Sequence, residues 1–127
     1  EICEDWIGPE TVRRKMEDGF VFGYLVENGR NAGFASFGLL GDGVIELDKL
    51  YIEPRFRGMG HGRKVLEGIL EHGRSLGCVK ATLVVNSSNA PAISLYERLG
   101  FVTEEARTYR RNGWPETRLY TMSVRIA

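Results

Sequence analysis

Three glycines lie within five residues at the junction between an apolar run and a helix-forming run. The apolar run 44–52 is typical of a strand, and the residues after the glycines show apolar side chains at helical spacing. A glycine-rich turn at a helix start leaves first-turn amides uncovered, and these amides, with the helix dipole, attract phosphate groups. The turn and its cations predict a site for a phosphate-bearing cofactor. The residues expected to bind it are Arg57, Gly58, Met59, Gly60, His61, Gly62, Arg63 and Lys64.

The same turn could also be a simple chain reversal or one of the known nucleotide-binding loops. Glycine adopts positive φ at little cost, so a glycine-rich turn can serve only to reverse the chain. The familiar nucleotide loops fit less well. No Gly-Lys-Ser/Thr follows Gly58 at P-loop spacing, and the third glycine comes one residue too early for a Rossmann GxGxxG fingerprint. Taken alone, the turn leaves cofactor capture and chain reversal both open.

A second block, residues 86–101, follows the apolar run 81–85. It predicts a polar turn and then a short helix. Asn89 is placed to cap that helix, Pro91 falls in its tolerated first turn, and Gly100 is placed to end it. The order strand, turn and short helix therefore occurs a second time after the glycine-rich turn.

Together, the two blocks resemble the GNAT superfamily of acyl-CoA-dependent N-acyltransferases. The cofactor loop of that family, Q/R-x-x-G-x-G/A, matches Arg57-x-x-Gly60-x-Gly62. Its second signature matches Asn89-x-x-Ala92-x-x-x-Tyr96-x-x-x-Gly100-Phe101. His61 departs from the aliphatic residue common at that loop position. The resemblance covers roughly residues 20–125 and implies one α/β (α+β) domain over 1–127. Its mixed, mostly antiparallel sheet would splay at the cofactor strand, with helices on both faces.

The resemblance also implies how acetyl-CoA would be bound. Backbone groups of Leu50, Tyr51 and Ile52 would bond the pantetheine arm, and the Ile52 N–H is our candidate for polarising the acetyl carbonyl. Asn89 would contact the same arm beside Ala92, and its capping role does not exclude this.

Two residues are candidates for moving protons. In the family, a tyrosine at the position of Tyr96 protonates the sulfur of coenzyme A; the alternative is an aromatic ring packed under its helix. A substrate ammonium with a pKa of about 10.4 must lose a proton before it attacks. Glu46 is the preferred base, and Asp48 and Glu53 are lesser candidates. Alternation places Glu46 and Asp48 on one strand face beside Leu50 and Ile52. A structural ion pair of Glu46 with an arginine stays open.

The amino-acid composition limits the classes of partner and ligand that the chain is expected to bind. The 17 Lys and Arg residues balance the 17 Asp and Glu residues, so no polyanion such as nucleic acid is predicted. Cys3 and Cys78 are isolated, His61 and His72 have no partner cluster, and no metal site is predicted. No apolar run approaches the roughly 18 residues of a membrane span. A cytoplasmic monomer or homodimer is expected.

The order of predicted elements is consistent with one domain. A helix is expected over 10–18, then strands 20–26 and 32–40 around the Asn28-Gly29 turn, followed by strand 44–53 and helix 59–76. Strand 79–85, helix 89–98 and strands 101–110 and 117–126 complete the series. Residues 1–6 make a poor strand, so the family's first strand is expected to be missing or trimmed.

These observations predict an N-acetyltransferase that moves an acetyl group from acetyl-CoA to a primary amine by direct attack in a ternary complex. The acceptor is left open among small molecules, protein N-termini and lysines. Its pocket is expected near helix 10–18 and the last hairpin, which carries Tyr109, Arg110, Arg111 and Trp114. The alternative is a non-catalytic acyl-CoA sensor.

Overall fold

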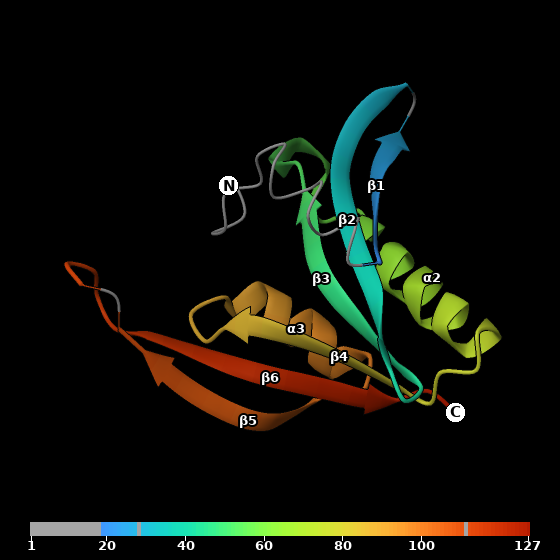
Figure 1. The fold of residues 1–127 in the computed structure, drawn as a ribbon. Coiled ribbons are helices and arrows are strands. Elements are labelled where there is room, and N and C mark those ends of the chain that lie inside the picture. Colours follow the sequence, from blue (N-terminus) through green and yellow to red (C-terminus); the bar gives the residue numbers. More distant parts are fainter. Residues whose placement is uncertain (1–18, 28, 111) are drawn as a thin grey trace.

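A computed structural model describes residues 19–127 except 28 and 111 (Figure 1). The helix expected over 10–18, the chain start and Arg111 lie outside the described residues. The elements are β1 (Phe20–Glu27), β2 (Arg30–Gly41), β3 (Val44–Ile52), the 3-10 turn η1 (Pro54–Phe56), α2 (His61–Ser75), β4 (Lys80–Asn86), α3 (Ala90–Arg98), β5 (Val102–Tyr109) and β6 (Thr117–Arg125). Within the described part, every predicted strand and helix is present.

The six strands form one sheet in the order β1-β2-β3-β4-β6-β5. Four of the five neighbouring pairs are antiparallel, and β3 with β4 is the parallel exception. A parallel pair needs a crossover connection, and α2 provides it. The predicted mixed, mostly antiparallel sheet is therefore confirmed.

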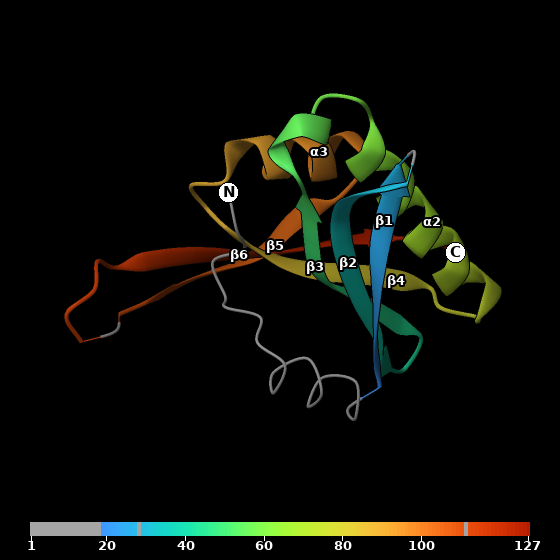
Figure 2. The same cartoon turned by 90° about the horizontal axis from the view of Figure 1, so that it is seen from above.

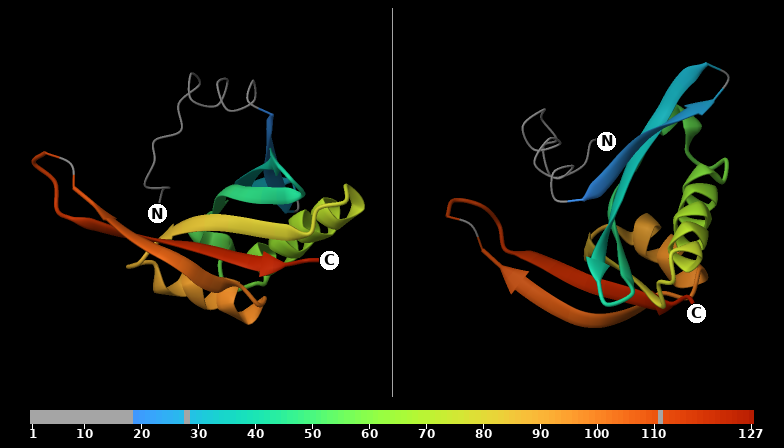
Figure 3. Two further views of the ribbon diagram at one scale, coloured as in Figure 1. Left: turned by 60° about the horizontal axis from the view of Figure 1, so that its bottom comes forward. Right: turned by 45° about the vertical axis from the view of Figure 1, so that its right-hand side comes forward.

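β3 and β4 pair only at their beginnings. Residues 44–47 of β3 lie beside residues 80–83 of β4, although β3 continues to Ile52 and β4 to Asn86. Figures 1 and 3 show the two strands diverging beyond this point. The register of β3 against β2 slips at the same place, because Phe37 pairs with Leu47 but Ser36 pairs with Lys49. Asp48 is thus an inserted residue, a bulge that bends β3 away from β4. The predicted splay is confirmed.

The core lies between the sheet and its two described helices, which Figure 2 shows on the same side of the sheet. The other predicted helix, 10–18, lies outside the described residues, so helices on both faces stay a prediction. Ile45, Leu66, Leu83 and Met122 are almost completely buried there. α2 approaches the sheet closely at Gly73, where an added Cβ would lie 2.9 Å from Cγ2 of Ile45. None of the described helices is long and apolar enough to span a membrane.

The start of α2 differs slightly from the prediction. The helix begins at His61, two residues later than expected, because Gly60 has φ +83° and cannot be part of a right-handed helix. Gly60 is instead the N-cap residue, and it contributes no side-chain hydrogen bond to the helix end. The helix terminus is therefore left to other partners.

Candidate active site

The glycine-rich turn forms an open cap on α2. Gly58 and Gly60 both have left-handed φ values, +79° and +83°, and a Cβ added to either would meet nothing within 4 Å. The first amide to find an acceptor within the helix is that of Lys64, which donates to the carbonyl of Gly60 at 3.1 Å. The amides of 61–63 precede it and lie at the positive end of the helix dipole. This open surface and these donors fit a pyrophosphate.

Gly62 sets how closely the turn approaches the rest of the site. A Cβ at this position would lie 3.4 Å from Cδ2 of Leu95 in α3 and 4.0 Å from Cδ2 of Leu50 in β3. The first turn of α2 is therefore packed where α3 and the free end of β3 meet. Phosphate donors and the splayed strand belong to one site.

Arg57 ties the turn back to β3. Its Nε donates to the carbonyl of Ile52 at 2.7 Å, and its guanidinium lies 5.5 Å from the centre of the Tyr51 ring. Arg63 forms an exposed ion pair with Glu67 at 3.1 Å. These contacts give Arg57 a positioning role within the protein, and its predicted contact with cofactor stays a prediction.

The end of β3 beyond Leu47 has backbone groups that no described strand pairs with on the side of β4. The amide of Glu53 donates to the carbonyl of Ala32 in β2 at 2.7 Å, so neighbouring residues alternate from that direction. The backbone groups of Leu50 and Ile52 then face away from β2, where β4 has diverged, as the bond from Arg57 to the Ile52 carbonyl requires. The backbone of Tyr51 faces β2 instead. Open amides at Leu50 and Ile52 suit a linear amide-bearing ligand.

The predicted arrangement of side chains on β3 is wrong beyond the bulge. Ile45 and Leu50 both point to α2, since they are close to Gly73 and Gly62 respectively. Strict alternation cannot place positions 45 and 50 on one face, but the residue inserted at Asp48 does. Glu46 therefore lies on the opposite face from Leu50 instead of beside it.

The three candidate acids occupy different environments. Glu46 is half-buried opposite Gly38 of β2 and Thr82 of β4. Asp48 accepts a hydrogen bond of 2.9 Å from the hydroxyl of Ser36, which is fully buried. No pattern within one segment of the sequence identifies this hydrogen bond, because it depends on the register of two strands.

Glu53 is held by its neighbour. Its carboxylate caps η1 by accepting from the Arg55 amide at 3.0 Å and from Arg55 Nε at 3.2 Å. The hydrogen bond from the Arg55 backbone, with the side-chain bond and charge of Arg55, lowers the pKa of Glu53 below its usual value. A carboxylate with a lowered pKa is a weaker base, which disfavours Glu53 in that role.

α3 carries the second signature. The predicted cap is confirmed: Oδ1 of Asn89 accepts from the amide of Ala92 at 3.3 Å. Tyr96 is only 8% exposed, and its ring centre lies 5.8 Å from that of Phe101. Its ring is thus part of the core, as the packing interpretation requires. The proposed role of its hydroxyl stays a prediction.

His61 has an unusual environment at the first residue of α2. Its ring centre lies 6.1 Å from that of Phe56, in an edge-on arrangement. Among the described residues, Nε2 of His61 is the buried side-chain nitrogen or oxygen that lacks a hydrogen-bond partner. Buried polar atoms are almost always paired, so this nitrogen indicates a missing partner at the cofactor turn.

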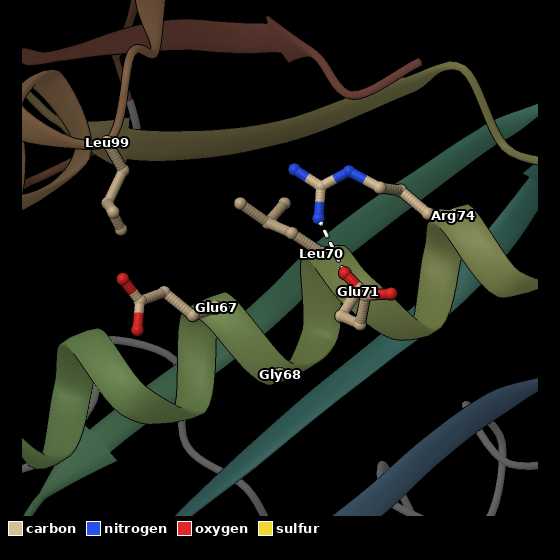
Figure 4. Close-up of a pocket in the computed structure, with 6 residues that line it drawn as sticks. All are labelled: Glu67, Gly68, Leu70, Glu71, Arg74 and Leu99. Atoms are coloured by element: carbon tan, nitrogen blue, oxygen red, sulfur yellow. Dashed lines mark hydrogen bonds and ion pairs between the residues drawn. The ribbon is translucent and has the colours of Figure 1, made fainter.

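An open hollow of about 520 Å³ lies elsewhere, between α2 and the end of α3 (Figure 4). It is lined by the second half of α2 and by Leu99, away from the helix start. Glu71 there is paired with Arg74 at 2.9 Å, and Glu67 with Arg63. Its charges are matched internally, and we assign it no part in the site.

The hairpin between β5 and β6 is well exposed. Tyr109 is 47% and Trp114 64% exposed, and Arg110 forms an ion pair with Glu116 at 3.4 Å across the turn. Their predicted contribution to an acceptor pocket stays a prediction.

Comparison with known proteins gives consistent results. The sequence model of the Acetyltransferase (GNAT) family matches residues 3–101. The [ribosomal protein bS18]-alanine N-acetyltransferase of Escherichia coli K12 is 39% identical over 93 residues, which cover 73% of this chain and 60% of that protein. Mycothiol acetyltransferase of Acidothermus cellulolyticus is 37% identical over 103 residues, 77% of this chain and 32% of that protein. The chain thus spans about one third to three fifths of the length of these relatives.

Solved structures agree with the fold. The Escherichia coli ribosomal-protein-S18-alanine N-acetyltransferase superposes with a TM-score of 0.83 at 26% identity, covering 98% of this chain and 81% of that one. The yncA protein of Salmonella typhimurium, solved with its cofactor acetyl-CoA, gives 0.75 at 26% identity, covering 91% and 69%. With both motifs placed at one site and a family match over most of its length, the chain belongs to the GNAT acetyltransferase family.

Proposed function

We propose that this chain transfers an acetyl group from acetyl-CoA to a primary amine by direct attack within a ternary complex. One observation carries the proposal: β3 loses its parallel partner after Leu47, so the backbone of Leu50 and Ile52 turns away from β2 with no described strand paired to it there, beside the glycine-rich turn. Family membership and the names of the relatives support the same activity.

Different groups of the chain bind different parts of the cofactor. The first-turn amides of α2 and the side chain of His61 hold the pyrophosphate. The amides of Leu50 and Ile52 hold the pantetheine arm from one side, and Asn89 contacts it from α3. When bound, acetyl-CoA supplies the activated acetyl group, and the Ile52 N–H polarises its carbonyl.

Proton movement is assigned to two side chains. Glu46 accepts the proton of the substrate ammonium, directly or through water, and Glu53 is disfavoured in this role because Arg55 lowers its pKa. Tyr96 holds a proton for the departing thiolate.

The names of two relatives indicate which classes of acceptor amine to test. One acts on an alanine of ribosomal protein bS18 and another, from Bacillus subtilis, on spermine and spermidine. Both acceptors carry a primary amine. A peptide with a free N-terminal alanine is the first acceptor to test, and spermidine is the second.

The proposal is tested by separating binding from turnover. We expect acetyl-CoA to bind in calorimetry, with Gly60→Glu abolishing binding because the new carboxylate enters the open phosphate surface. Glu46→Gln and Tyr96→Phe should each lower kcat for coenzyme A release by about 100-fold or more, while Kd for acetyl-CoA stays within about threefold. Tyr120→Phe, a half-buried tyrosine on β6, is the matched control and should leave both unchanged.

The sensor alternative predicts a different pattern. Acetyl-CoA would bind with the same dependence on Gly60, but no amine would release coenzyme A above the rate of hydrolysis. That result would reject the transferase. Absence of acetyl-CoA binding at millimolar concentration would reject both functions.

A further inference from the structure

β5 is the last strand of the sheet and is bonded on one side only. It pairs with β6, and no described strand lies beyond it (Figures 1 and 3). All eight of its residues are exposed, including Val102 at 62% and Tyr109 at 47%. An exposed strand edge without proline offers a row of backbone groups to another strand.

The charges along this edge indicate which strand it fits. Glu105 and Arg107 lie two positions apart, so their side chains share one face of the sheet. Neither forms an ion pair with another described residue, whereas neighbouring Glu104 is held by Lys80 at 3.1 Å. We propose that β5 pairs antiparallel with β5 of a second copy of this chain, about a twofold axis at Ala106. Glu105 of each copy then faces Arg107 of the other.

The register follows from symmetry and charge. In an antiparallel pair, two residues directly opposite each other point to the same face of the sheet, so in two copies of one strand their numbers differ by an even number. The twofold axis therefore passes through a residue and not between two residues. An axis at Glu105 or at Arg107 would place two like charges directly opposite each other, which is unfavourable. An axis at Ala106 instead brings two opposite-charge pairs together around a small neutral residue. Charge therefore selects one register among these neighbours.

The proposed contact is centred on the regular part of β5. The pairing of β5 with β6 shifts between Thr103 and Glu105, so Glu104 is an inserted residue, a bulge near the start of the strand. Glu105 and Arg107 both lie on the other side of this bulge, where β5 pairs with β6 without interruption up to Tyr109. The two Glu105–Arg107 pairs therefore carry the proposal.

Charge reversal provides the test. In sedimentation equilibrium, we expect a reversible dimer of the wild-type chain in the micromolar range. Glu105→Arg and Arg107→Glu should each weaken it by about 30-fold, because each replaces two attractive pairs by two repulsive ones. The double variant E105R/R107E should dimerise within about threefold of wild type. A mixture of the two single variants should form a heterodimer.

Controls separate this result from misfolding and from the proposed function. Glu97→Arg, a reversal of the same sign on the exposed face of α3, should leave the dimer unchanged. At protein concentrations low enough for the dimer to dissociate, each variant should have the same midpoint of thermal unfolding as the wild type. The measurement needs no acetyl-CoA, so its outcome is independent of catalysis. A monomer at all concentrations, or a double variant that stays as weak as the single ones, would overturn the proposal.

Discussion

The unpaired nitrogen of His61 leads to a prediction in which stability and affinity change in opposite directions. Nε2 is buried without a partner at the first residue of α2. Leaving a buried polar atom unpaired costs about 1–3 kcal/mol of folding free energy. His61→Leu removes that atom with a side chain of similar size, so the cofactor-free protein should become more stable by about this amount. In a chain of this length, that is a rise in Tm of about 4–12 °C.

Cofactor binding should change the other way. If the missing partner of Nε2 is the pyrophosphate, the leucine variant loses a hydrogen bond to a charged group, worth about 1.5–3 kcal/mol. Kd for acetyl-CoA should then rise by about 10-fold to 100-fold. Dephospho-acetyl-CoA keeps the pyrophosphate and should lose affinity by the same factor.

Calorimetric melting and titration of the same protein samples measure both effects. His72→Leu, an exposed histidine on the same helix, is the control and should not shift affinity. A lower or unchanged Tm for His61→Leu would refute the cost assigned to the buried nitrogen. A raised Tm with unchanged affinity would show that pyrophosphate is not its partner.

Two further predictions concern stability. Gly73→Ala should destabilise the protein by about 1–3 kcal/mol in urea unfolding despite alanine's better helix propensity, because its Cβ would lie 2.9 Å from Cγ2 of Ile45 and 3.3 Å from Cδ1 of Ile126; Ile45→Ala, which removes that Cγ2, should cost less in the Gly73→Ala background than in the wild type. Arg55 lowers the pKa of Glu53 in the folded state, so the carboxylate of the unfolded chain takes up its proton at a higher pH. The contribution of Glu53 to the free energy of unfolding is therefore present above about pH 4.3 and is lost as the pH falls through the folded pKa. Urea midpoints of wild type and Glu53→Gln should therefore differ at pH 7 and converge as the pH falls through the folded pKa of Glu53; a constant difference would contradict this.

The sequence predicts the elements well because their signals are local. Glycine turns, the Asn89 cap and apolar spacing place the described strand and helix boundaries within two residues of those observed. The mixed sheet and its splay came from the family resemblance, and the register confirms them. The observed start of α2 differs from the predicted one because Gly60 adopts a left-handed φ, a conformation that is open to glycine but that the sequence does not require.

The features that escaped prediction depend on residues far apart in the chain. The hydrogen bond from Ser36 to Asp48 depends on how β2 pairs with β3. The contact of Gly73 with Ile45 depends on how α2 crosses the sheet, and the unpaired nitrogen of His61 depends on everything packed around it. No periodicity within one segment reports these relations.

The bulge at Asp48 connects the fold to the chemistry. Without the inserted residue, alternation would turn Leu50 to the face of Glu46 and leave the start of α2 without its contact on β3. With it, Leu50 packs toward Gly62, the strand bends away from β4, and the backbone beyond position 48 pairs with β2 but not with β4. Glu46 stays on the opposite face, just before the point where the strands part. One extra residue in β3 therefore puts the packed side chain of Leu50 and the proposed base Glu46 on opposite faces, at the point where β3 parts from β4.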